Sequence, residues 1–154
     1  MRFIFRSFAL IVFLLSACIP SRAAGADRSL ALDEQQLLQM EQRAEQASPR
    51  DQCFLYTELV SAMTDLAGRQ LRDGDPDRAT ATLKKVAKYA SLIQSSLTRD
   101  AKRLKNAEKL MHDTTYRLNQ YLHSASYEDQ PTLQATLKQL NQVQSQLLTQ
   151  VFSH

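Results

Sequence analysis

The chain has 154 residues and a formal net charge of +3, with 44% hydrophobic and 23% charged residues. It contains only three Gly and four Pro, whereas Ala, Leu, Gln, Lys, Arg and Glu are abundant. These abundant residues favour helices, and no segment shows the sustained alternation of β-branched residues that strands require. The composition therefore predicts an all-α protein, and two cysteines exclude a disulfide-rich framework.

The first residues follow the order of an export signal. Arg2 and Arg6 precede an apolar run at residues 9–17, and Pro20 and small residues come after it. The run is shorter than the ~20 apolar residues that a transmembrane helix needs. A basic, then apolar, then small-residue order is typical of a secretory signal peptide. We therefore expect an exported protein that is periplasmic, anchored in the envelope or secreted.

The signal has two possible cleavage sites. Residues 24–26 form an A-x-A pattern, and cleavage after Ala26 would remove a signal peptide of residues 1–26. Residues 15–18, which read LSAC, resemble instead a bacterial lipobox. That resemblance implies that Cys18 is lipidated, becomes the first residue of the mature chain and associates the protein with a membrane.

The charge balance changes once the signal is removed. Residues 27–154, which we expect to form a single all-helical domain, contain 16 basic and 16 acidic residues. If the lipobox is used, the signal is residues 1–17. The charges remain segregated, because residues 27–77 carry a net −6 and residues 78–109 a net +7. A neutral mature chain gives no argument for a nucleic-acid partner.

Turn residues and apolar spacing predict four helices in an elongated antiparallel bundle, at residues 33–47, 49–72, 77–124 and 132–152. Asp33 is the expected N-cap of the first helix. The wide apolar face of the second helix predicts burial against two neighbours. A tight turn is expected where Asp73-Gly74-Asp75-Pro76 combines a helix-ending Gly with a capping Asp and a Pro at the first helical position.

The third predicted helix is a long spine of about 48 residues, roughly 70 Å, because no Gly or Pro interrupts residues 77–124. Its heptad seam has a stutter near Leu97, so a break near Thr98 is the alternative. The last helix carries apolar residues at heptad spacing and predicts a C-terminal coiled hairpin against the spine. On the outer face of that helix most residues are Gln, and Lys138 is the only charge.

Two resemblances to known families add expectations. One set of residues stands at the spacing of a tetratricopeptide hairpin: Met63, Leu66, Ala67, Gly74, Asp75, Ala79 and Leu83. This resemblance, over residues 63–83 only, implies two closely packed helices. Residues 32–36, LDEQQ, resemble the L-T-x-x-Q motif at helix starts of small periplasmic stress chaperones and metal-resistance sensors. That second resemblance implies an exported chaperone or an envelope-stress or metal sensor.

The sequence offers little that indicates catalysis. No Gly-rich phosphate loop or nucleophile, base and acid set is visible, so no enzyme, cofactor or metal site is expected. Glu108 and His112, spaced i,i+4, could supply two metal ligands. We expect instead that Glu108 is a seam residue whose carboxylate is satisfied by His112 or by a facing Gln such as Gln142 or Gln144. Cys53, in the first turn of a helix, is expected to be a small residue at the edge of the apolar face rather than a reactive thiolate.

Basic residues cluster on the predicted spine helix. Eight of them are expected to project from its outer side: Lys84, Lys85, Lys88, Arg99, Lys102, Arg103, Lys105 and Lys109. They indicate either a face for an anionic partner or a solvated surface. Few aromatic residues lie among them, so nucleic-acid base stacking is not expected. The sequence thus predicts a non-enzymatic exported interaction or scaffold protein, with a protein partner or self-association through helices. The chaperone or stress sensor is the alternative.

Overall fold

The structure, a computed structural model, describes residues 23–98 and 100–153, with side chains from residue 34 onward. It divides into two units, Met1–Leu32 and Asp33–His154. Of the first unit only residues 23–32 are described, and they are helical. The possible lipidation site Cys18 and most of the expected signal lie outside the described residues. Within the described part no helix is long and apolar enough to cross a membrane.

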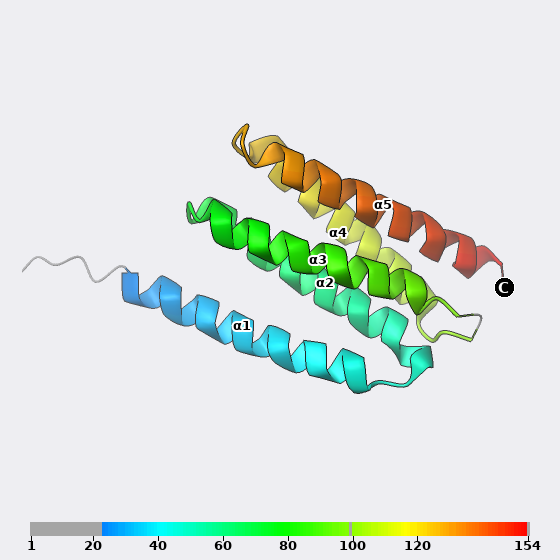
Figure 1. Cartoon of the computed structure of the whole chain (residues 1–154). Helices are drawn as coiled ribbons and strands as arrows, with labels where there is room; N and C mark the ends of the chain where they lie inside the picture. The colour runs from blue at the N-terminus through cyan, green and yellow to red at the C-terminus, as the bar shows by residue number, and fades with distance from the viewer. Residues whose placement is uncertain (1–22, 99, 154) are drawn as a thin grey trace, which may run out of the picture. The chain divides into compact units, whose positions relative to one another are not determined.

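All regular elements in the described residues are helices, which confirms the all-α prediction. In chain order they are α1 (Ala23–Gln46), α2 (Pro49–Arg72), α3 (Pro76–Ser95), α4 (Leu104–Ser124) and α5 (Gln130–Phe152). In the second unit, α2 with α3 and α4 with α5 form two antiparallel hairpins that lie side by side (Figure 1). Helix α2 packs on α4 and α3 packs on α5, so that α3 and α4 occupy opposite corners.

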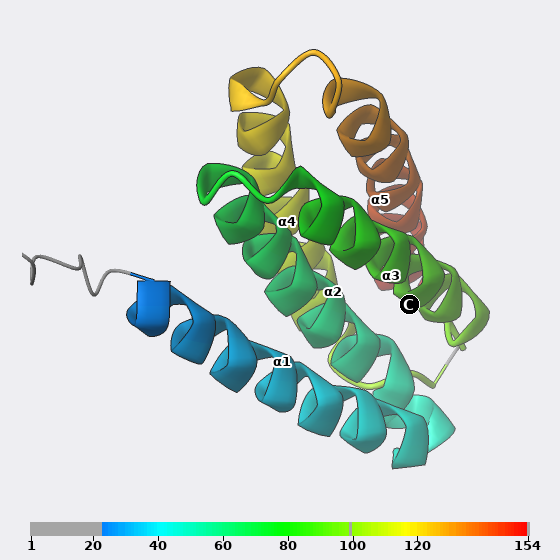
Figure 2. The ribbon, with the colours of Figure 1, turned by 60° about the vertical axis from the view of Figure 1, so that its left-hand side comes forward.

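Most residues of α2 are buried, and Figure 2 shows α3 and α4 beside it. Its neighbours are α3 and α4, as the width of its apolar face predicted. The portion of α1 within the second unit adds Leu37, Met40 and Ala44 to the same core. An exposed ion pair between Glu34 and Arg78, 2.6 Å long, also links α1 to α3. Helix α2 contributes more buried residues than any other described helix.

The turn between α2 and α3 forms as the sequence predicts. Gly74 has a φ of 78°, in the left-handed region that glycine tolerates. The side chain of Asp75 accepts a hydrogen bond from the backbone N–H of Arg78 at 3.1 Å, and Pro76 occupies the first helical position. A left-handed residue followed by a capped Pro reverses the chain in few residues. The two helices are thereby brought into an antiparallel hairpin.

The prediction of a continuous spine helix over residues 77–124 is wrong. The chain leaves the helical path after α3 and resumes it at α4, close to the break that the stutter near Leu97 allowed. This connection contains no Gly or Pro. It is held instead by contacts with residues that are far away in the sequence. The backbone N–H of Lys102 donates to the carbonyl of Arg50 at 2.7 Å, and the Arg50 guanidinium pairs with the Asp100 carboxylate at 3.1 Å.

Folding back at this connection increases the buried apolar surface. Arg103 adopts φ 58°, the only positive φ of a non-glycine residue in the described chain, and starts α4 in the new direction. Met111 and Leu118 on α4 then become fully buried in the core shared by α2 and α5. A straight continuation would carry these side chains away from α2. The gain of about 2 kcal/mol for each buried side chain explains why the break forms.

The first helix also starts earlier than predicted. Asp33 was expected to cap it, but α1 begins at Ala23 and runs through residue 33 without interruption. Residues 23–32 are rich in Ala and Leu, which are strong helix formers, so the helix extends across the expected cap. The L-T-x-x-Q-like residues 32–36 therefore lie inside a helix and not at its start.

Candidate interaction surface

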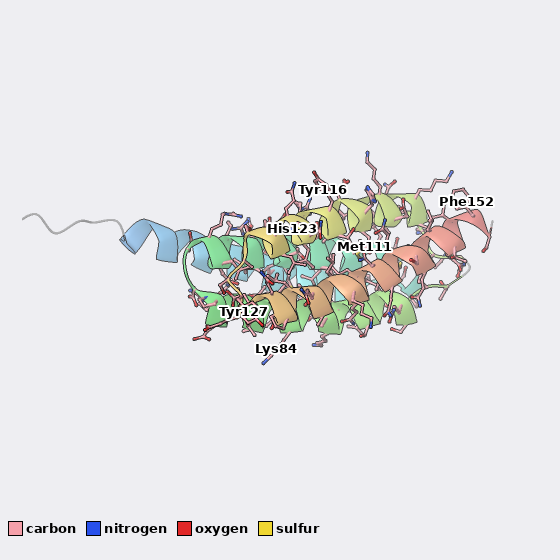
Figure 3. The ribbon with its side chains drawn as sticks, turned by 90° about the horizontal axis from the view of Figure 1, so that it is seen from above. Lys84, Met111, Tyr116, His123, Tyr127 and Phe152 are labelled. Atoms are coloured by element: carbon pink, nitrogen blue, oxygen red, sulfur yellow. The ribbon has the colours of Figure 1, made fainter. Side chains whose placement is uncertain are left out.

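The eight basic residues singled out by the sequence do not share one face. Lys84, Lys85 and Lys88 lie on α3, whereas Lys105 and Lys109 lie on α4, at the opposite corner of the helix arrangement. In Figure 3, Lys84 projects from the side opposite to Tyr116, which belongs to α4. The single basic face required a continuous spine helix and is therefore not formed. Arg99 lies outside the described residues.

Two of the eight basic residues hold the connection between α3 and α4 against α2. Lys102 Nζ lies 3.6 Å from an Asp51 carboxylate oxygen, and the Arg103 guanidinium stacks 3.8 Å from the centroid of the Phe54 ring. A hydrogen bond from the Ser48 hydroxyl, with the charges of Lys102 and Arg103, keeps the pKa of Asp51 below its usual value. The charges of Lys102 and Arg103 are therefore paired within the fold.

Four of the other lysines are exposed and make no ion pair with the described residues, and Lys88 Nζ lies 5.0 Å from the centroid of the Tyr89 ring. Within residues 34–98 and 100–153, no ion pair involves Lys84, Lys85, Lys105 or Lys109. Each is exposed on the outer side of its helix. Because they are divided between two opposite corners, they form two small charged areas that do not meet.

His112 is part of a polar contact between α4 and α5. Its Nδ1 lies 3.0 Å from Nε2 of Gln144, and the Thr115 hydroxyl donates to Oε1 of the same amide at 3.1 Å. Gln144 therefore contacts His112 and Thr115, whereas the described residues show no hydrogen bond or ion pair for Glu108, for which a partner was expected. Glu108 is half-buried nearby on α4. No group of three or more potential metal ligands occurs among the described side chains.

Cys53 is fully buried in the core, at 0% exposure. Burial, offset slightly by a hydrogen bond with Ser96, raises the pKa of its thiol to about 11 from an ordinary 9.0. A protonated and inaccessible thiol is a poor nucleophile. Cys53 is therefore a small packing residue and not a reactive thiolate, but it lies within the core and not at the edge of the apolar face.

The raised pKa of Cys53 predicts a loss of stability at alkaline pH. The folded chain keeps this proton more tightly than the unfolded chain, so the contribution is complete below pH 9 and is lost as pH rises towards 11. Chemical denaturation at pH 8 and pH 10 should show the wild type losing about 1 kcal/mol more than Cys53→Ala. Tyr56, whose pKa burial also raises, is present in both proteins and cancels in the comparison. Equal losses in the two proteins would contradict the prediction.

A groove borders the N-terminal end of α2. It has a volume of about 620 Å³, and its wall includes Arg43, Asp51 and Arg103 together with amide side chains of α1. The two guanidinium groups therefore share the groove with a carboxylate, and Arg103 is already stacked on Phe54. A bound anion would have to compete with Asp51, so this groove is a weak candidate for a binding site.

The outer face of α5 carries almost no charge. Lys138 is the only charged residue of the helix. A shallow groove of about 470 Å³ runs along this face, lined by Gln134, Leu137, Lys138, Asn141, Gln142 and Ser145. Beyond the groove, Leu148 is 43% and Phe152 80% exposed. The sequence showed the lack of charge, but only the packing of α5 on α3 and α4 shows which side chains remain uncovered.

The residues that resemble a tetratricopeptide hairpin pack between α2 and α3. Met63, Ala67, Ala79 and Leu83 are buried, and the two alanines are at most 1% exposed. These small side chains lie where α2 and α3 pack against each other. The second hairpin, α4 with α5, lies beside the first with its helices in the same directions (Figure 1).

Comparison with protein-family models, curated proteins and solved structures finds no match to this chain. The functional argument therefore rests on the surfaces described above, and the outer face of α5, with Lys138 as its single charge, is the strongest of them.

Proposed function

We propose that this chain is an exported, non-enzymatic interaction protein of the cell envelope that binds a protein partner through the outer face of α5. The observation that supports the proposal is the exposed helix face with a single charge and with Leu148 and Phe152 uncovered. Depletion of charge and enrichment in aromatic residues distinguish the centres of protein interfaces from other surface. Phe152, at 80% exposure, is the kind of side chain that anchors such contacts.

The charged, imidazole and thiol side chains of the second unit support the same proposal, because several of them form contacts between helices. Arg117 on α4 pairs with Asp65 on α2 at 2.9 Å and donates to the Ser61 hydroxyl at 2.7 Å. His112 contacts Gln144, and Cys53 is buried. These groups stabilise packing between helices and are not gathered around a cavity.

The outer faces of α3 and α4 are less suitable for a protein contact. Lys84, Lys85 and Lys88 on α3, and Lys105 and Lys109 on α4, would lose hydration if a neutral surface covered them. Amide and hydroxyl side chains on α5 cost less to cover, because a partner can satisfy their hydrogen bonds. Binding through α5 therefore desolvates the fewest charges.

A photo-crosslinking amino acid at Gln142 tests the proposal. Gln142 is exposed in the groove on α5, and the matched control position is the exposed Lys84 on α3. After irradiation of cells producing the full chain, we expect a discrete adduct of defined mass from position 142 and none from position 84. Phe152→Glu in the same chain should reduce the adduct at position 142 at least about fivefold, because it places a charge in the contact.

Two outcomes would contradict the proposed function. The first is the absence of an adduct from position 142 in cells that clearly produce the protein. The other is the same set of adducts from positions 142 and 84, which would indicate contact without a preferred face.

A further inference from the structure

A second heptad pattern runs along the exposed side of α5. The buried seam contains Leu133, Leu140 and Leu147. The exposed positions repeat at steps of three and four: Pro131, Gln134, Lys138, Asn141, Ser145, Leu148 and Phe152. One step earlier the pattern reaches Tyr127, in the turn before α5, which is 89% exposed. The residues at the two ends of this row, Tyr127, Pro131, Leu148 and Phe152, are apolar, those in the middle are polar, and the whole row is exposed in the described chain.

We propose that the exposed seam of α5 binds the same seam of a second copy of this chain, with the two helices antiparallel. This inference rests on the proposed function, because it names the partner of the α5 face. In an antiparallel pair the first heptad position of one helix lies opposite the second of the other. One register of this kind places Phe152 opposite Tyr127 of the second copy and Leu148 opposite its Pro131.

The two aromatic side chains that are most exposed among the described residues support a second copy as the occupant. Tyr127 and Phe152 lie at opposite ends of α5 (Figure 3) and are too far apart to contact each other within one chain. An antiparallel copy brings each of them to its counterpart at both ends of the contact. Both pairs form from the same two residues, because a two-fold interface uses each contact twice.

The same register suits the polar middle of the seam. It places Ser145 opposite Gln134 and Asn141 opposite Lys138, so that each ammonium group meets an amide oxygen and no like charges face each other. Sliding the helices by one heptad would instead place Leu148 opposite Lys138 and leave Tyr127 uncovered. The apolar ends and the single charge thus favour one alignment.

The expected dimer is weak. Helix α5 has 23 residues and is about 35 Å long, so one helix pair buries less than a standard protein interface. The middle layers are polar and contribute hydrogen bonds more than apolar burial. We expect a dissociation constant on the order of 10–100 µM, which sedimentation or light scattering can measure.

Disulfide trapping tests both direction and register. The full chain would carry Cys18→Ser throughout, and the buried Cys53 does not compete. Gln134→Cys and Ser145→Cys chains, mixed and mildly oxidised, should form a mixed disulfide dimer. Each variant alone should stay monomeric, because the antiparallel register separates like positions by about 16 Å along the axis. Pairing Ser145→Cys with Ala81→Cys, on the exposed side of α3, is the control.

Each result of the disulfide experiment either supports or contradicts the proposed dimer. Disulfide dimers from either variant alone would indicate a different alignment and overturn the proposal, as would failure of the mixture to exceed the Ala81→Cys control. Phe152→Glu should raise the dissociation constant at least about tenfold while circular dichroism and melting temperature stay unchanged, because the side chain is 80% exposed. An unchanged dissociation constant would also count against it.

The outcome for self-association can be separated from the outcome for the proposed function. An adduct from Gln142 with twice the mass of the chain supports self-association. An adduct of another mass, with no mixed disulfide between the variants at 134 and 145, overturns self-association but keeps α5 as an interaction face. No adduct and no disulfide would overturn both.

Discussion

Replacing Gly68 by leucine is expected to lower the free energy of unfolding by about 3 kcal/mol. Gly68 lies on α2 where it meets α4, and a Cβ atom there would overlap the Tyr121 ring. Such an overlap requires the ring or the helix to move. Leucine is also a better helix former than glycine by nearly 1 kcal/mol, so any net loss of stability comes from the close approach of the two helices.

A double-mutant cycle with Tyr121→Ala separates these effects. Tyr121→Ala alone removes the ring and its contact with the Arg72 guanidinium, 5.8 Å from the ring centroid. In that background Gly68→Leu should cost much less, or stabilise, because the space above α2 is open. Urea denaturation of the four proteins gives the coupling energy. Equal costs of Gly68→Leu with and without the tyrosine would show that the α2–α4 contact is not tight here.

Thr82→Val is expected to destabilise the protein by about 2 kcal/mol although it changes the side-chain volume little. The Thr82 hydroxyl donates to Oε1 of Gln70 at 2.8 Å, and these side chains are 8% and 2% exposed. Valine removes the donor and leaves the Gln70 carbonyl buried without that hydrogen bond. The cost is the desolvation of the amide, which water cannot reach to offset.

Replacing both partners provides the control for this second prediction. In Gln70→Met with Thr82→Val no polar group remains unsatisfied at this point between α2 and α3. The double variant should therefore be more stable than Thr82→Val alone, as thermal and urea denaturation would show. If both variants lose the same stability, the hydrogen bond contributes less than packing does, and the explanation is wrong.

The parts of the fold that local residue chemistry determines could be predicted from the sequence. Gly74, Asp75 and Pro76 specify the turn between α2 and α3, because each satisfies a backbone requirement of that turn. The apolar spacing of α5 likewise predicts its buried seam of Leu133, Leu140 and Leu147. These features depend on residues within a few positions of one another.

The break between α3 and α4 could not be predicted with the same certainty. Its contacts join Arg50 to Asp100 and Lys102, residues about fifty positions apart, and no local Gly or Pro marks it. The expected basic face failed for the same reason, because it depended on helix continuity through Arg103. For α5, the low charge of the helix could be predicted from the sequence. Which of its side chains are exposed could not, because that depends on which side of the helix meets α3 and α4.

The order in which the helices pack also bears on how fast the chain folds. The strongest packing joins helices that follow each other in the chain, α2 with α3 and α4 with α5. Short connections close with little loss of chain entropy, and folds dominated by local contacts reach the native state quickly. Each hairpin can form before the other is complete, and docking of the two then closes only the connection at residues 96–103. The chain thus spends little time with its apolar seams exposed to aggregation.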